Sequence, residues 1–266
     1  MKIIALTAVV VFSASGLNAA TPGSDNAADL AYGGSGAGSF DGKDGGTPVS
    51  FSPWMVTPNP TGTTSAGSFI GDSTTLASNN SGGNVNTSGV SFGLFGHSGA
   101  FVNAVRSFDA PLLNGQSFII QLAVNFRNGN KGIDVRDPNG NVIFDLNIGG
   151  DDYSVNNTGG GTTNLFDMVY DPNTVFTVQL TQIDPTDGSW TIIRSGGHTG
   201  TATSGIFPYQ GLAASFDLYN VATTGGGAPE DNLFFNNIQI VPEPSTLVLL
   251  FGSTFLGALL YVRRQW

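Results

Sequence analysis

The sequence has 266 residues, no cysteine and few charged side chains. Without thiols the chain cannot form disulfides or thiolate metal sites. Charged residues make up 11% of it, against about 25% in an ordinary globular domain. Nineteen of them are Asp or Glu and nine are Lys or Arg, for a net charge of -10. So few cations cannot neutralise a row of phosphates, which excludes nucleic acid as a partner.

Helix-forming patterns are also scarce. The chain has seventeen Asp and only two Glu, Glu230 and Glu243. Asp and Asn favour turns, whereas Glu favours helix. No stretch between the two ends of the chain offers ten residues of clean helical periodicity. We therefore expect strands and loops.

Period-two alternation and turn signals predict about ten short strands. The clearest is 117–126, with Phe118, Ile120, Leu122, Val124 and Phe126 on one face. Asp137-Pro138-Asn139-Gly140 and Asp184-Pro185-Thr186-Asp187-Gly188 are typical reverse turns between strands. The other predicted strands are 49–55, 68–70, 91–95, 104–108, 132–136, 142–148, 174–183, 190–194, 212–219 and 233–240. This pattern predicts an all-β fold, an antiparallel sandwich forming one domain over residues 21–241.

The N-terminus has the features of an export signal. Lys2 precedes an apolar run, and small residues follow from Ser13 to Ala20. We expect a signal peptide over residues 1–20, cut between Asn18 and Thr21. The alternatives are a buried first strand and a retained membrane anchor, although the run is short for a membrane span.

The C-terminus predicts a second membrane segment. Val241-Pro242-Glu243-Pro244 precedes Leu247 to Val262, which carry no charge, and Arg263-Arg264 follow. A helix over 246–262 would be about 25 Å long, slightly less than a hydrocarbon core of about 30 Å. The two arginines would hold the C-terminus on the cytoplasmic side.

This arrangement resembles the PEP-CTERM sorting signal of Gram-negative bacteria. The resemblance covers Val241 to Trp266 and implies recognition by exosortase, a membrane-embedded protease. Pro242, Glu243 and Pro244 would be the recognition motif, and Arg263 and Arg264 the cytoplasmic stop. The signal implies transient attachment to the inner membrane and then release to the cell surface or extracellular matrix. An ordinary tail anchor is the alternative.

The body resembles concanavalin-like jelly rolls. The segment Gly211 to Asn220 is similar to their penultimate strand, and Asp231 to Ile238 to their closing strand. Asp25 to Gly46 is rich in glycine, but Tyr32 and Phe40 indicate that it is draped on the sandwich.

Catalytic patterns are weak. A glycosidase needs two carboxylates across a cleft, but Glu230 lies in a Gly/Pro loop and Glu243 in the sorting signal. The pairs Asp134/Asp137, Asp151/Asp152 and Asp184/Asp187 fall at predicted turns. His97 and His198 lie in glycine-rich loops, and neither is near a Gly-x-Ser-x-Gly elbow. We therefore expect that the protein is not an enzyme.

Metal and ice binding have little support. The two histidines have no ligand spacing for zinc. Oxygen ligands for Ca²⁺ could come from Asp41/Asp44, Asp151/Asp152 or Asp184/Asp187, yet none matches a calcium loop. We therefore expect no cofactor and keep Ca²⁺ as an alternative. The run Thr199-Gly200-Thr201-Ala202-Thr203 occurs once, which argues against a repeated ice-binding array.

Sugar binding would use exposed aromatic rings beside Asn and Asp. Trp54 and Trp190 are the candidates, with Tyr153, Tyr209 and Tyr219 as lesser ones; alternation with Ile192 also favours a core position for Trp190. The primary hypothesis is a non-catalytic, structural or adhesive protein of the cell surface or matrix, in a biofilm and exopolysaccharide context. The alternatives are a carbohydrate-binding module and, further behind, a polysaccharide hydrolase.

Overall fold

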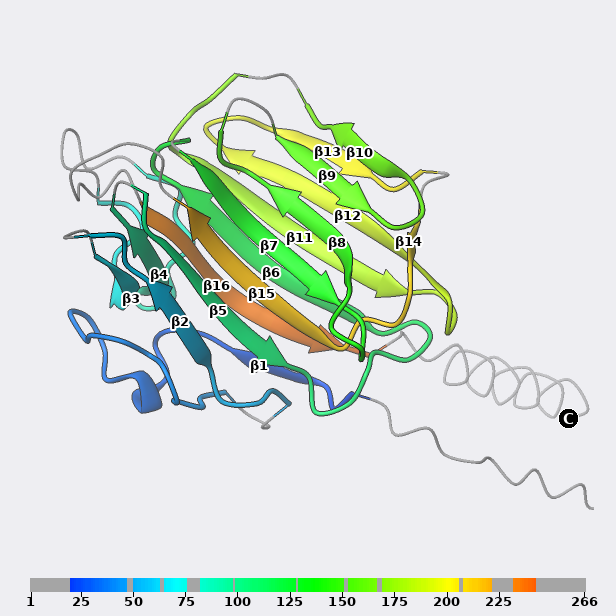
Figure 1. Ribbon diagram of the computed structural model, residues 1–266, viewed down its shortest axis with the longest axis horizontal. Coiled ribbons are helices and arrows are strands. Elements are labelled where there is room, and N and C mark those ends of the chain that lie inside the picture. Colours follow the sequence, from blue (N-terminus) through cyan, green and yellow to red (C-terminus); the bar gives the residue numbers. More distant parts are fainter. Residues whose placement is uncertain are drawn as a thin grey trace, which may run out of the picture.

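The computed structural model describes residues 20–46, 50–62, 65–75, 82–97, 99–127, 129–150, 153–166, 169–205, 208–221 and 232–242. In this part of the chain two antiparallel sheets pack face to face, as Figure 1 shows. One 3₁₀ turn, Leu30–Tyr32, is the only helical element among the described residues. The prediction of an all-β antiparallel sandwich is confirmed.

The larger sheet has nine strands. The closing strand β16 lies near its centre, between β6 and β4, and β1 pairs with the later part of β16. The strand order is β13 (Gly200–Thr203), β12 (Asp187–Gly196), β11 (Thr174–Gln182), β6 (Ser117–Val124), β16 (Asn232–Val241), β4 (Ser91–Gly96) and β3 (Ala66–Gly71), with β1 (Gly23–Asp25) on β16 and β14 (Tyr209–Gln210) on β12.

The smaller sheet has seven strands, and β15 lies between β7 and β5. Its order is β10 (Gly161–Asn164), β9 (Ser154–Asn157), β8 (Val142–Asn147), β7 (Asn130–Arg136), β15 (Ser215–Val221), β5 (Phe101–Ser107) and β2 (Met55–Asn59). Every pairing is antiparallel.

The core follows from the alternation along each strand. Phe118, Ile120 and Leu122 of β6 are fully buried between the sheets. Phe126, which we expected on the same face, lies beyond the end of β6 and is 49% exposed. The predicted face is correct, but the predicted strand is two residues too long.

Short polar strands are missing from the sequence-based prediction. They are β1, β9, β10, β13 and β14, which have two to four residues each. Their sequences, such as Gly161-Thr162-Thr163-Asn164, carry no apolar alternation, and pairing with a neighbouring strand fixes them instead. The strand expected over 49–55 is also wrong: Phe51 makes a single bridge to Phe108, and β2 begins only at Met55.

The segment between β1 and β2 covers one side of the sandwich. Tyr32 and Phe40 are fully buried, which confirms that Asp25 to Gly46 is draped on the sheets. The amide of Gly36 donates to the Ile70 carbonyl, and the amide of Ile70 donates to the Ala37 carbonyl. These bonds satisfy the outer edge of β3, which would otherwise be open to another strand.

Arg106 of β5 points into the sandwich and its side chain is fully buried. Its guanidinium pairs with Asp25 of β1 and, at 2.6 Å, with Asp44. The ring of Trp54 lies 5.1 Å from the guanidinium carbon, and the Tyr32 hydroxyl donates to Asp25. Because β5 and β1 belong to different sheets, this ion pair links the two layers.

We predict that Arg106→Met lowers the free energy of unfolding by about 3–5 kcal/mol, because it leaves the Asp25 carboxylate buried without its cation. Urea unfolding of the body measures the loss. A second replacement, Asp25→Asn, removes the stranded charge, so the double variant should lose less than the sum of the two single changes. A loss below about 1 kcal/mol for Arg106→Met, as for an exposed pair, would contradict this account.

Candidate functional site

Both tryptophans proposed for sugar binding are buried. Trp54 is 1% exposed and Trp190 is 4% exposed. The Trp54 ring packs at 5.2 Å from Phe40 and the Trp190 ring at 6.1 Å from Phe144. The prediction of an exposed tryptophan platform is therefore wrong, because Trp190 takes an inward position of β12 and Trp54, just before β2, packs into the aromatic core.

The two histidines are far apart. His97 follows β4, and its Nδ1 lies 3.0 Å from the Ser65 hydroxyl. His198 lies in the turn after β12. Since β12 and β4 are four strand positions apart, the spacing between strands separates them by about 19 Å. Among the described residues, no group of three or more His, Cys, Asp or Glu could hold a metal ion.

The Asp pairs proposed from sequence have different roles. Asp184 accepts hydrogen bonds from the Thr186 hydroxyl and from the amides of Thr186 and Asp187, as a turn residue should, and these bonds, the hydroxyl first, lower its pKa. Asp41 accepts from the Val56 amide, and Asp44 pairs with Arg106. Asp151 and Asp152 lie outside the described residues.

Asp134 does not belong to a turn, contrary to the prediction. It lies within β7, directly across from Asp217 of β15 on one side and Asp145 of β8 on the other. The alternating neighbours Ile133 and Val135 are buried between the sheets. The three carboxylates therefore form a row on the outer face of the seven-stranded sheet, called here the acidic row.

Tyr219 of β15 lies next to this row. It is the cross-strand partner of Gly132, yet its hydroxyl donates to Asp145 of the following strand at 2.7 Å. A Cβ at Gly132 would lie 2.7 Å from the Tyr219 oxygen and 1.8 Å from the Leu146 carbonyl oxygen. The side chain of Tyr219 thus crosses the outer face over a position that only glycine can occupy.

One cation and one amide hold the row in place. The same Arg136 nitrogen lies 2.7 Å from Asp134 and 3.3 Å from Asp217. The Asn103 amide donates to Asp217 at 3.1 Å. Asp217 itself is 3% exposed, so its charge is held inside the protein surface by these two side chains.

The pKa values of the acidic row are raised. Burial, together with the neighbouring Asp145 charge, raises the pKa of Asp134 to about 7. Burial also raises the pKa of Asp145 and of Asp217. Asp134 and Asp145 are direct cross-strand partners, and two neighbouring carboxyl groups cannot both ionise easily, so this pair holds one proton between them near neutral pH.

A depression of about 290 Å³ opens beside these residues. It will be called the Tyr219 pocket. Its lining combines one aromatic ring with carboxyl, amide and hydroxyl groups from four strands. The lining residues are Asn130, Asp134, Asp145, Asn147, Ser154, Tyr219 and Val221.

The sequence-based prediction includes Tyr219 only as a lesser candidate and does not include Asp145 or Asp217. The sequence does contain a pattern that indicates the acidic row. Each Asp of the row stands between two apolar residues within a strand, as in Phe216-Asp217-Leu218. Asp is depleted in strands, so its recurrence at the outward position of three strands marks a shared polar face.

Of the predicted sorting residues, the structure describes Pro242, which is exposed directly after β16. Glu243, Pro244, Arg263 and Arg264 lie outside the described residues, as does the expected helix over 246–262. Within the described part, no helix has the length and apolarity that a membrane crossing requires.

Comparison with known families identifies the tail. Residues 241–265 match the PEP-CTERM protein-sorting motif. This confirms the resemblance drawn from Pro242, Glu243, Pro244 and the terminal arginines. The motif marks the chain as an exported protein that is sorted through the membrane. It covers a small part of the chain and says nothing about the activity of the body.

Solved structures similar to this chain are β-sandwich proteins, as the jelly-roll resemblance implied. A sialidase matches with TM-score 0.41 and 12% identity over 61% of this chain, which is 16% of the sialidase. An alginate lyase from Corynebacterium sp. matches with TM-score 0.40 and 11% identity over 71% of this chain and 93% of its own. A galectin of Caenorhabditis elegans matches with TM-score 0.32 and 14% identity over 48% and 84%. These likenesses concern the fold alone. No curated protein matches the sequence.

We predict that the body becomes less stable as the pH rises from about 4 to about 7. The pKa of folded Asp134, about 7, exceeds its ordinary value of 3.8, so the folded state holds the proton more tightly than the unfolded state. The stabilisation is complete below the ordinary value and is lost as the pH approaches 7. Urea unfolding across this range should show a slope of up to about 1.4 kcal/mol per pH unit for one proton.

The matched variants are Asp134→Asn and Asp184→Asn. The first removes the titrating group and should flatten the slope. The second removes a carboxyl whose pKa lies below the ordinary value, so it stays ionised in this window and its loss should leave the slope unchanged. An equally steep slope in Asp134→Asn would contradict the shared proton.

Proposed function

We propose that this chain is an exported, non-catalytic protein of the cell surface or extracellular matrix that holds polysaccharide on the outer face of its seven-stranded sheet. The sorting motif supports the route, and the Tyr219 pocket supports the adhesive role. In this proposal residues 1–20 are a signal peptide, 21–241 the sandwich and 242–266 the sorting signal. Exosortase would recognise Pro242, Glu243 and Pro244 while the tail helix holds the chain in the inner membrane.

The Tyr219 side chain is the observation that carries the binding proposal. Its hydroxyl is anchored on Asp145 at 2.7 Å, so the ring is held in one place before any ligand arrives. Asn147 and Ser154 line the same pocket with amide and hydroxyl groups. A sugar offers an apolar ring face to an aromatic side chain and hydroxyl groups to its polar neighbours, and a preorganised site costs less entropy on binding.

The geometry of the acidic row argues against hydrolysis. Glycosidases keep their two carboxyl groups about 5–5.5 Å or 6.5–9.5 Å apart, so that the sugar or a water fits between them. One Arg136 nitrogen lies 2.7 Å from Asp134 and 3.3 Å from Asp217, so the guanidinium, and not a sugar or a water, occupies the space between these two carboxyl groups. Asp217 is held by Arg136 and Asn103. We therefore propose binding without catalysis and without a metal or other cofactor.

A glycan array of the purified body tests the binding function. We expect binding to at least one polysaccharide, and we expect Tyr219→Ala to weaken it about tenfold, which corresponds to about 1.4 kcal/mol. Tyr219→Phe keeps the ring and should retain more of the affinity than Tyr219→Ala. Thr191→Ala, on the outer face of the other sheet, is the control and should bind like the native protein.

Three results would contradict the proposal. Undiminished binding by Tyr219→Ala would place the ligand elsewhere, and hydrolysis of any bound polysaccharide would make the protein an enzyme. Absence of binding to every glycan would overturn sugar recognition.

Mass spectrometry of the protein from its native cells tests the route. We expect an N-terminus near residue 20. Ala20 is fully buried and its carbonyl accepts a hydrogen bond from Gln116 at 2.7 Å, so within the expected window a cut after Ala19 would keep this packing and a cut after Ala20 would remove it. We also expect loss of the tail near Glu243. A mature surface form that still ends in Arg263-Arg264-Gln265-Trp266 would refute removal of the tail.

A further inference from the structure

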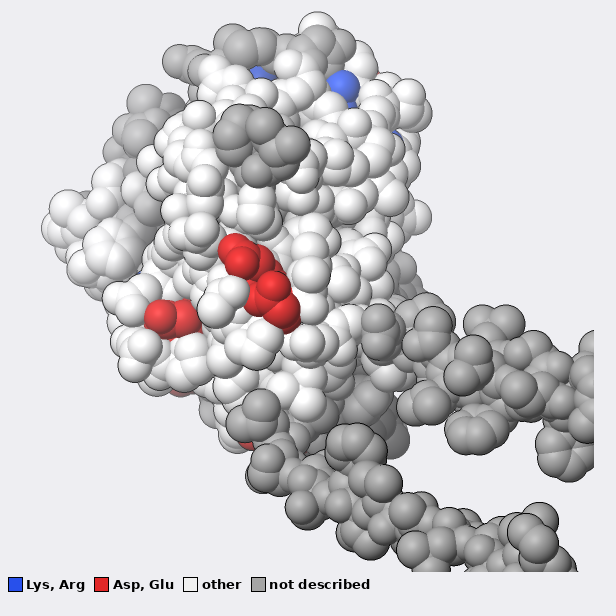
Figure 2. Space-filling view, turned by 90° about the vertical axis from the view of Figure 1, so that its right-hand side faces the viewer, with Lys and Arg blue, Asp and Glu red and all other residues white. Residues whose placement is uncertain are grey.

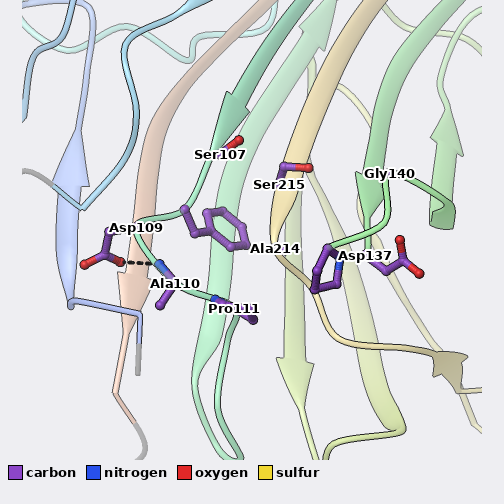
Figure 3. Close-up of a pocket in the computed structure, with 10 residues that line it drawn as sticks. Ser107, Asp109, Ala110, Pro111, Asp137, Gly140, Ala214 and Ser215 are labelled. Atoms are coloured by element: carbon purple, nitrogen blue, oxygen red, sulfur yellow. Dashed lines mark hydrogen bonds between the residues drawn. The ribbon is translucent and has the colours of Figure 1, made fainter. Parts of the chain in front are cut away.

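A second depression, of about 320 Å³, lies at the opposite end of the same sheet face. It will be called the Pro138 pocket. Figure 3 shows Ser107 and Ser215 on one side of it, with Asp109 and Asp137 at opposite ends. The lining residues are Ser107, Phe108, Asp109, Ala110, Pro111, Asp137, Pro138, Gly140, Ala214 and Ser215.

Strand β15 contributes residues to both pockets. Tyr219 and Ser215 both belong to β15 and have the same parity, so both point outward. They are four positions apart along the strand, which corresponds to about 14 Å in an antiparallel sheet. The acidic row and Arg136 lie between them, because Asp217 is the residue midway along β15. The face is therefore one track with a pocket at each end.

The Pro138 pocket offers hydroxyl groups and apolar walls. Within the part of the chain that the structure describes, neither the Ser107 nor the Ser215 hydroxyl has a hydrogen-bond partner, so both can bind a ligand. Pro111 and Pro138 both line the pocket and contribute apolar rings. This combination suits a sugar ring, which needs hydrogen bonds at its edge and apolar contact at its face.

The two carboxylates of this pocket are already occupied. Asp109 accepts from the Ala110 amide at 3.0 Å and from Thr21. Asp137 accepts from the amides of Asn139 and Asn141, and the hydrogen bonds from Asn141 and Asn139 hold its pKa below the ordinary value. Asp137 therefore stays ionised without needing a cation from the ligand.

The charge along the track is negative. Arg136 is the one described cation among Asp109, Asp134, Asp137, Asp145 and Asp217 on this face. Figure 2 views the molecule from the right-hand side of Figure 1, where acidic groups also lie on a mostly uncharged surface. A polymer that carries carboxylates or sulfates would be repelled along its whole length.

We propose that the track binds a single neutral polysaccharide chain lengthwise along β15, with the Tyr219 pocket and the Pro138 pocket as two separate subsites. This inference rests on the proposed function and adds the charge class and the minimum length of the ligand. Short oligosaccharides reach one pocket only. Chains that cover about 14 Å reach both pockets. Once such a chain is bound in one pocket, its binding to the other pocket is intramolecular, which raises the affinity.

The test is calorimetric titration of the native body with neutral β-glucan and mannan ladders, from disaccharide to octasaccharide, and with alginate oligosaccharides of the same lengths. We expect affinity for the neutral sugar to rise about tenfold or more once the chain spans both pockets. We expect no binding of alginate at physiological salt. The double variant Ser107→Ala/Ser215→Ala should bind short chains like the native protein but lose the gain with length.

The control is Ser189→Ala/Ser195→Ala, two outward serines of β12 on the other sheet, which should keep the gain. Thermal unfolding checks that both double variants fold. Affinity independent of length, or an undiminished gain in Ser107→Ala/Ser215→Ala, would overturn the second subsite and leave the proposed function standing. Preference for alginate would overturn the neutral ligand class. Absence of binding to every ladder and to the glycan array would overturn both proposals.

Discussion

The buried ion pair between Arg106 and Asp25 is the constraint on which the rest of the fold depends. The chain has no cysteine, so no disulfide ties one sheet to the other. Arg106 of the smaller sheet instead reaches Asp25 of the larger one in the interior, where each charge would be costly without the other. The same contact fixes β1 and, through Tyr32, the segment that covers the edge of β3.

Once the two sheets are joined, each strand has one buried face and one face toward water. On the seven-stranded sheet the outward positions carry Asp217, Tyr219 and Asp134 instead of scattered neutral residues. Burying Phe216 and Leu218 on the other side of β15 keeps these polar side chains in fixed register. The outer face on which we propose ligand binding is therefore a direct consequence of core packing, and the raised pKa of Asp134 follows from its burial and its cross-strand pairing with Asp145.

The sequence predicts much of the fold and little of the site. Long strands such as β6 and β11 carry clear alternation and are found where expected, and the tail motif is recognisable from Pro242, Glu243 and Pro244. Alternation with Ile192 already favours the buried position found for Trp190, whereas Trp54 lies outside any strand, so no periodicity indicates that it is buried. The acidic row joins residues up to 83 positions apart, from Asp134 to Asp217, and only strand order brings them together.

We propose that the ligand binds on the outer face of the seven-stranded sheet. Nuclear magnetic resonance of the labelled body, titrated with a neutral octasaccharide that binds it, tests this location most directly. We expect the largest changes in amide chemical shift in β5, β7, β8 and β15, from Tyr219 to Ser215. Shifts concentrated on β6, β11 and β12 of the larger sheet would contradict it.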